Sequence, residues 1–115
     1  MNPYLERVMM SNNTDTSYEV VFICDGIKYY GLTDEDIFFD TLERISSISK
    51  IYGSYKGLHI CFSSTHIPDE DLRSLIGLFY RYRMDMKLLK VFLTESNKAW
   101  FFEDATTFWH DKVFC

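Results

Sequence analysis

Three stretches decide the expected fold: LHICF at residues 58–62, PDEDLRSLIGLFYRYR at residues 68–83 and LLKVFL at residues 88–93. The first and third are short apolar runs of the kind that form buried strands, and the middle one repeats apolar residues at helical spacing after a proline. The order strand, helix, strand predicts two parallel strands joined by a right-handed crossover.

Upstream of this unit, the pattern predicts a β-hairpin. Tyr18–Cys24 is rich in β-branched and aromatic residues, Ile27–Tyr30 is apolar or aromatic apart from one lysine, and Asp25-Gly26 stands between them. Asp-Gly at this place favours a type I′ turn, because both central residues of that turn need a positive φ. We therefore assign Asp25 to turn formation rather than to catalysis.

A helix is expected next, from Thr33 to about Ser49, because a hydroxyl cap and three acids suit a helix start. At about 100° per residue, the stripe expected to face the core contains Ile37, Phe38, Thr41, Leu42, Ile45, Ile48 and Tyr52. The side expected to face solvent contains Asp36, Phe39, Asp40 and Glu43, with Glu35 at its border. Residues 53–57 are expected to end the helix and turn the chain.

The central helix is expected to run from Pro68 to about Arg83, with an acidic first turn that suits the helix dipole. Its expected buried stripe contains Leu72, Leu75, Ile76, Phe79 and Tyr82. After the strand at residues 88–93, a polar connection predicts a hairpin to a further strand at Ala99–Phe102. Residues 104–114 fit either a short helix capped by Asp104 or a last strand, and the helix is favoured.

These elements predict an α/β (α+β) fold, with a mixed sheet of about five strands in ββαβαββ order and helices packed on it. Residues 1–115 are expected to form a single globular domain, because a chain with 47% hydrophobic residues can bury a core without a metal or a disulfide. Within it, residues 1–17 are expected to be an N-terminal segment, with a short helix from Asn2 and a polar linker, and residues 18–115 the core.

The charge balance bears on the class of partner. Seventeen acidic residues oppose twelve basic ones, giving a net charge of −5. This balance does not favour binding to nucleic acid and suits a basic partner. The start of the chain lacks the pattern of a signal peptide, and no apolar run approaches the roughly 18 residues that span a bilayer. We expect a cytoplasmic protein without a membrane partner.

The cysteines and histidines predict no catalytic or metal site. Cys24, Cys61 and Cys115 are an odd number without CxxC spacing, which is typical of passive thiols in a reducing compartment. Cys61 with His59 or His66 is the only local pair for a Cys/His enzyme, but its strand is apolar overall. The candidate zinc ligands His59, Cys61, His66, His110 and Cys115 lack closely spaced couples. We expect no enzyme, no metal and no cofactor.

Seven acidic residues of the two predicted helices and one aromatic residue among them are the candidate partner-binding residues: Glu35, Asp36, Phe39, Asp40, Glu43, Asp69, Glu70 and Asp71. Acids at a helix start also favour the helix dipole, which alone explains many of them. An aromatic residue on a charged, solvent-facing side is less easily explained that way. Such residues are common anchors at protein interfaces.

The acid-rich stretch DEDIFFD at residues 34–40, the aromatic content of 17% and the aromatic ending WFF at 100–102 and WHD at 109–111 are the features that carry a resemblance. In these features the chain resembles the small acidic immunity proteins of bacterial contact-dependent inhibition and related polymorphic toxin systems. The resemblance implies a cytoplasmic, non-enzymatic inhibitor that binds and neutralises a cognate toxin, often a basic nuclease. The alternatives are a small adaptor or homo-oligomer, since exposed aromatic residues also build dimers, and then a small Cys/His enzyme.

Overall fold

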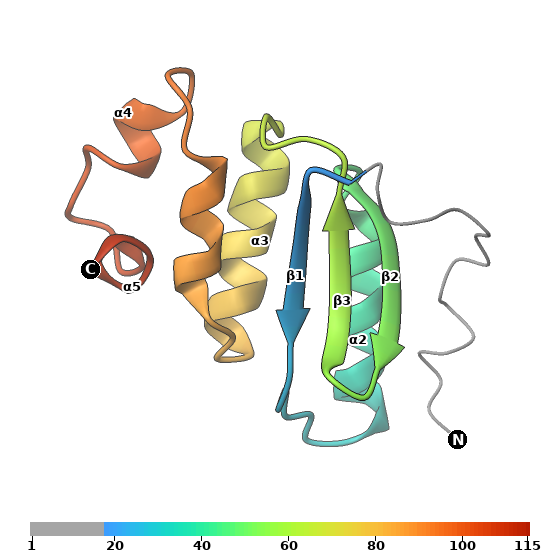
Figure 1. Ribbon diagram of the computed structural model, residues 1–115. Coiled ribbons are helices and arrows are strands. Elements are labelled where there is room, and N and C mark those ends of the chain that lie inside the picture. The colour runs from blue at the N-terminus through green and yellow to red at the C-terminus, as the bar shows by residue number, and fades with distance from the viewer. Residues whose placement is uncertain (1–17) are drawn as a thin grey trace. The chain divides into compact units, whose positions relative to one another are not determined.

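The computed structural model describes residues 18–115, so the helix from Asn2 and the linker predicted for residues 1–17 lie outside the described residues. By its internal contacts the chain divides into two compact units, residues 1–64 and 65–115 (Figure 1). We describe each unit by itself. The prediction of one domain over residues 1–115 stays a prediction.

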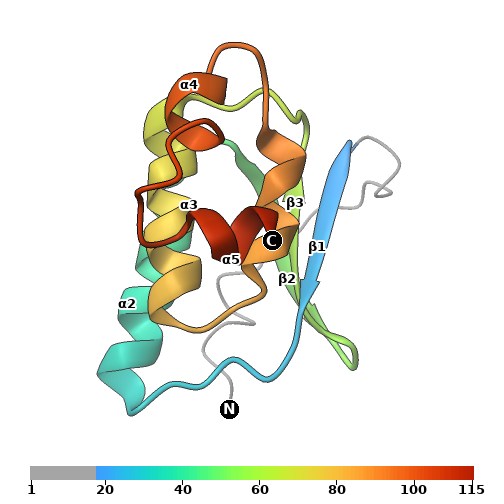
Figure 2. The same ribbon diagram turned by 90° about the vertical axis from the view of Figure 1, so that its left-hand side faces the viewer.

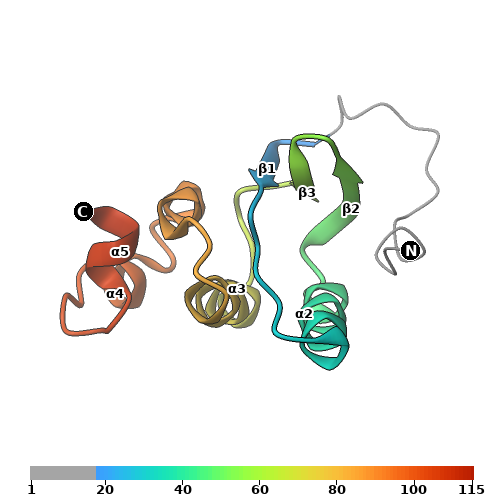
Figure 3. The same ribbon diagram turned by 90° about the horizontal axis from the view of Figure 1, so that it is seen from below.

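The first unit is a three-stranded antiparallel sheet with one helix. Its strands β1 (Val20–Cys24), β2 (Ile48–Ser54) and β3 (Gly57–Phe62) lie in the order β1-β3-β2. The central strand β3 pairs antiparallel with both neighbours, on which Ile23 and Tyr52 stand opposite His59. Helix α2 (Leu32–Arg44) lies along one face of this sheet, as the view in Figure 3 shows.

The predicted mixed sheet of about five strands is wrong, because the described residues contain three strands and no parallel pair. β1 does not form a hairpin across Asp25-Gly26, and the predicted strand Ile27–Tyr30 has no regular structure. Almost every residue of β3 is buried. An apolar strand buries most surface when it is paired on both sides, so β1 pairs with β3 rather than with its neighbour in sequence.

The hairpin of this unit is instead formed by β2 and β3, which a turn at Tyr55 and Lys56 joins. Gly57 follows the turn with a φ of 126°, where a Cβ atom would overlap the backbone carbonyl of Cys24. The helix predicted to reach Ser49 ends at Arg44. β-branched and aromatic residues between 48 and 52 fit a pleated strand better than a helix, and here they pair with β3.

The second unit contains only helices: α3 (Asp69–Arg81), the 3₁₀-helix η2 (Met86–Phe92), α4 (Lys98–Phe101) and α5 (His110–Phe114). The apolar stripe predicted for α3 is confirmed, since all five of its residues are buried. Within this unit α5 packs against η2, which is the unlabelled orange helix behind α5 in Figure 2. The preference for a helix near the C-terminus is confirmed, although that helix starts at His110 rather than after Asp104.

The strands predicted at residues 88–93 and 99–102 are wrong, because these residues lie in η2 and α4. Met86, Leu89 and Phe92 are the buried residues of η2, and their spacing of three is the period of a 3₁₀-helix. The Asp85 carboxylate accepts a hydrogen bond from the Lys87 backbone N–H at 3.1 Å and so caps its start. A local helix therefore satisfies backbone groups that the prediction gave to a sheet.

Asn97 shapes the connection that the prediction read as a hairpin loop. Its amide donates to the Phe92 carbonyl at 2.8 Å, and its Oδ1 accepts from the Thr94 N–H at 2.8 Å. The side chain is 2% exposed. These bonds fold residues 92–97 back into a compact turn, after which α4 begins.

In residues 18–115, no helix is long and apolar enough to cross a membrane.

Candidate functional site

Helix α2 contains most of the predicted partner-binding residues, but its buried face differs from the prediction. Phe38, Phe39 and Leu42 are its buried side chains. Phe39 is 1% exposed, and its ring lies 4.9 Å from that of Phe38 and 6.3 Å from that of Tyr29, between ring centroids. The prediction that Phe39 faces solvent is therefore wrong. The predicted stripe was drawn toward Ile48 and Tyr52, which belong to β2 and not to this helix.

The outer side of α2 is acidic and partly apolar. Asp36, Asp40 and Glu43 are exposed, and Glu35 is half-buried at the border of this side. Ile37, which was predicted to face the core, is 49% exposed on the same helix. Tyr30 and Leu32, at the start of the helix, are 84% and 75% exposed. We call the set Tyr30, Leu32, Asp36, Ile37, Asp40 and Glu43 the acidic α2 surface.

Local hydrogen bonds fix the start of this surface. The Asp34 carboxylate accepts from the backbone N–H of Tyr30 at 2.9 Å, which holds the residues before the helix close to its first turn. Helix α2 begins at Leu32, after Gly31 with a φ of 145°, so the predicted cap at Thr33 is wrong. Asp34 and Glu35 lie in the first turn, where acids favour the helix dipole.

The three acids predicted on α3 lie in the other unit. Asp69 and Glu70 are exposed, whereas Asp71 is 8% exposed and counts among the buried residues of the helix. A buried carboxylate is a poor contact for a partner, because it would first have to be uncovered. Asp71 therefore serves the start of α3 rather than a docking surface.

The hairpin of β2 and β3 contains the first candidate for catalysis. Ser54 Oγ lies 2.8 Å from His59 Nε2, as a nucleophile and a base would. The Tyr52 ring stacks on the imidazole with 4.4 Å between centroids, and His59 Nδ1 is buried without a hydrogen-bond partner in the described part of the chain. In a catalytic triad a third group orients the base through that nitrogen, and residues 18–115 place no such group there. The predicted partner Cys61 is fully buried.

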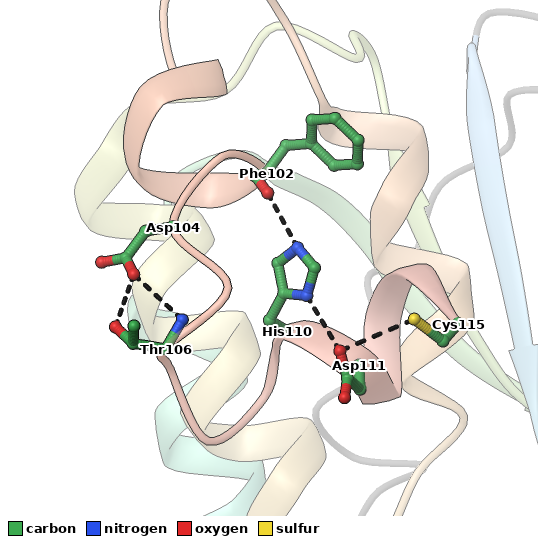
Figure 4. A network of polar contacts seen from close by, with 6 residues as sticks. All are labelled: Phe102, Asp104, Thr106, His110, Asp111 and Cys115. Atoms are coloured by element: carbon green, nitrogen blue, oxygen red, sulfur yellow. Dashed lines mark hydrogen bonds and ion pairs between the residues drawn. The ribbon is translucent and has the colours of Figure 1, made fainter.

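A second cluster of reactive side chains lies near the C-terminus (Figure 4). His110 Nε2 lies 2.7 Å from the Phe102 carbonyl oxygen, so Nε2 donates its proton there. Nδ1 lies 3.1 Å from the Asp111 carboxylate, which also accepts from the Cys115 thiol at 3.6 Å. With both ring nitrogens occupied, His110 has no lone pair available as a base or as a metal ligand. The cluster connects α5 to the end of α4.

The pKa shifts agree with this structural role. The hydrogen bond to Asp111 raises the pKa of His110, and the same bond lowers the pKa of Asp111. Partial desolvation and the nearby Asp111 charge raise the pKa of the exposed Cys115 thiol, which favours its protonated form. Asp104 accepts from the Thr106 hydroxyl and N–H, and these bonds lower its pKa.

Among residues 18–115, no group of three or more His, Cys, Asp or Glu side chains is placed to hold a metal.

Sequence reasoning missed the exposed apolar residues Tyr30, Leu32 and Ile37. Tyr30 was assigned to a strand and Ile37 to the core stripe. Had the helix been ended at Arg44, its apolar residues would have centred on Phe38, Phe39 and Leu42. Ile37 would then have fallen on the outer side.

Comparison with known proteins gives no further guide, since no protein-family model, no curated protein and no solved structure matches the chain.

Proposed function

We propose that this chain is an immunity-type inhibitor that binds a basic protein partner on the acidic α2 surface and acts in the cytoplasm. The observation that supports this proposal most is the exposure of Tyr30, Leu32 and Ile37 among acidic residues. Apolar and aromatic anchors inside a polar, solvent-accessible rim are the usual arrangement of a protein interface.

Charge complementarity indicates the chemistry of the partner. From Leu32 to Glu43 the helix has five acidic residues and no basic one before Arg44. A field of one sign speeds the encounter with an oppositely charged protein and rejects partners of like charge. A nuclease toxin has a cationic cleft for its nucleic acid, so an acidic surface that docks there would block the substrate. This partner class is also the one that the resemblance to immunity proteins implies.

The test uses the purified product of the gene immediately upstream as the probe, with surface plasmon resonance as the readout. Leu32→Ser combined with Ile37→Ser should weaken binding by roughly tenfold or more, because apolar anchors dominate such interfaces. Val91→Ser combined with Leu93→Ser is the matched control, since these residues are 40% and 37% exposed in the other unit. The control should bind as the parent does.

Electrostatics provides a second readout on the same sensor surface. Raising the salt concentration should slow association more than it speeds dissociation, because exposed charges are screened beyond about 8–10 Å at physiological ionic strength. Asp36→Asn with Asp40→Asn should reduce that salt dependence, whereas Glu95→Gln with Glu103→Gln changes the net charge equally and should not. An association rate that does not change with salt concentration would contradict docking on α2. Equal effects of the two double variants on that salt dependence would contradict it as well.

The competing adaptor function predicts a different result. A homo-oligomer that uses the same apolar residues would show a mass above that of one 13.7 kDa chain in size-exclusion chromatography with light scattering. Leu32→Ser with Ile37→Ser would then return it to one chain. That outcome would replace the inhibitor proposal.

A further inference from the structure

The second unit contains a hollow of about 960 Å³ at the C-terminal end of α3, with the following turn and α5 in its wall. Arg81, Arg83, Lys87 and Lys112 line it, and Asp85 is the only acid among its lining residues. The volume lies in the range of small-molecule sites, and the hollow is open to solvent. Its charge is opposite in sign to that of the whole chain.

These four basic side chains are not neutralised within the described part of the protein. None of them makes an ion pair in residues 18–115. Lys112 lies over the Tyr80 ring, 6.0 Å from its centroid. The Asp85 carboxylate is engaged as the cap of η2 and faces the Lys87 backbone N–H. The hollow thus retains an excess of positive charge.

Backbone geometry at Arg83 adds an independent observation. The Met84 N–H bonds the Phe79 carbonyl at 2.9 Å and the Arg83 N–H bonds the Tyr80 carbonyl at 3.3 Å, which is the Schellman pattern of a helix end. Arg83 occupies the position where glycine is usual, with a φ of 56°. A side chain there costs conformational energy that glycine would not. Strained residues of this kind concentrate at functional sites.

The helix dipole explains only part of this arrangement. A basic residue in the last helical turn favours the negative end of the dipole, and Arg81 is in that turn. The effect falls off within one turn, whereas Arg83 lies beyond the helix end and Lys87 and Lys112 belong to η2 and α5. Three of the four cations therefore need another explanation.

We propose that this hollow binds a small polyphosphate anion, with Arg81, Arg83, Lys87 and Lys112 as its ligands. A single carboxylate would leave most of the positive charge unmatched, and a monophosphate would match at most about two of the four side chains. A di- or triphosphate carries the charge of several of them. Arginine forks bind phosphate oxygens in pairs, and lysines add point charges around them. The site is independent of the acidic α2 surface, which belongs to the other unit.

The test is calorimetric titration of the full chain with tripolyphosphate at low ionic strength. Arg83→Gly should weaken binding roughly tenfold or more, as expected when a charge-assisted hydrogen bond is lost. The same change should leave the melting temperature equal or higher, because glycine adopts a positive φ without strain. Lys87→Ala with Lys112→Ala should weaken binding as well. Lys90→Ala, an exposed lysine of η2 outside the hollow, is the matched control and should not.

The ligand series distinguishes the sources of the phosphates. Equal affinity for ATP and tripolyphosphate would indicate recognition through the phosphates alone. If ATP binds more tightly than tripolyphosphate and Tyr80→Leu abolishes the difference, the site also contacts the base of the nucleotide. Absent tripolyphosphate binding, equal binding of citrate, equal weakening by Lys90→Ala, or preference for a short single-stranded RNA would each overturn the proposal.

Discussion

Helices α2 and α3 have the same length of thirteen residues, the same acidic first turn and an arginine in the last turn. They differ in how they end. After α2, the cap residue Ile45 has extended backbone angles, and the chain continues into β2. After α3, Arg83 has the left-handed backbone conformation, which redirects the chain, and η2 follows. The backbone of one or two residues thus decides whether a helix leads into a sheet or into another helix.

The two helices also differ in how much of their surface is buried. α3 buries six of its residues, including Asp71, whereas α2 buries only Phe38, Phe39 and Leu42. A helix covered on one side leaves a wide outer face, and on α2 that face is acidic and partly apolar. This difference is why we place partner binding on α2, although both helices start with acids.

The largest expected effect tests the assignment of the two faces of α2. Phe39→Ala should lower the free energy of unfolding by about 3–5 kcal/mol, because it empties a fully buried ring site against Phe38 and Tyr29. Ile37→Ala should cost less than about 0.5 kcal/mol, since its side chain is half-exposed. Denaturant unfolding of both variants measures this. Similar losses for the two would break the distinction between the buried and outer sides.

A smaller effect is expected from the glycines of the two units. Gly57→Ala should destabilise by roughly 1–3 kcal/mol, because an alanine at this positive φ is strained and its Cβ meets the Cys24 carbonyl. Its counterpart is Gly77 in α3, where a Cβ would meet nothing within 4 Å. Gly77→Ala should stabilise by about 0.5–1 kcal/mol through its higher helix propensity. Thermal melts of the two variants should shift in opposite directions, and a shared direction would contradict the geometry of the β2–β3 turn or of α3.

The smallest effect concerns pH and is confined to the second unit. The pKa of His110 is raised from its ordinary value of 6.5 in the folded state, so its contribution to stability is complete below that value and is lost as pH rises through the raised pKa. Asp111 has a lowered pKa, so its contribution disappears only at acidic pH, well below this range. The melting temperatures of the parent and of His110→Asn should differ most near pH 6 and converge as the pH rises. A gap that widens with pH would show that the imidazolium is not the stabilising form.

The parts of the fold that could be predicted are those whose ends are marked in the sequence. α3 begins after Pro68 with three acids, and four of the five residues of its predicted stripe lie within the helix, with Tyr82 as its C-cap. Its position, to within two residues at each end, and its buried side were therefore predicted correctly. No glycine or proline separates α2 from β2 before Gly53. The predicted apolar stripe of the helix therefore included residues of β2, and the buried face assigned from it excluded Phe39.

The sheet could not be predicted, because its pairing is non-local. Asp25-Gly26 is a strong local turn signal, yet the burial gained when β1 joins β3 outweighs it. Tyr30 was assigned to the second strand of the predicted hairpin, so this part of the candidate site was missed with the sheet. At Arg83 the sequence has no glycine to mark the chain reversal, and the convergence of Arg81 and Lys87 with the distant Lys112 depends on it.

The strand order β1-β3-β2 also bears on the order in which the strands pair during folding. β2 and β3 are joined by a two-residue turn, and such hairpins form within about 1–10 μs. Pairing of Cys24 with Leu58 instead closes a long loop that contains α2 and β2. Because closing a long loop costs more entropy, we expect the hairpin to form early and β1 to dock late. Until then the uncharged strand VVFIC of β1 and one edge of β3 are both open to pairing with another molecule. The same central strand that completes the sheet therefore makes the nascent chain most prone to aggregate before it has folded.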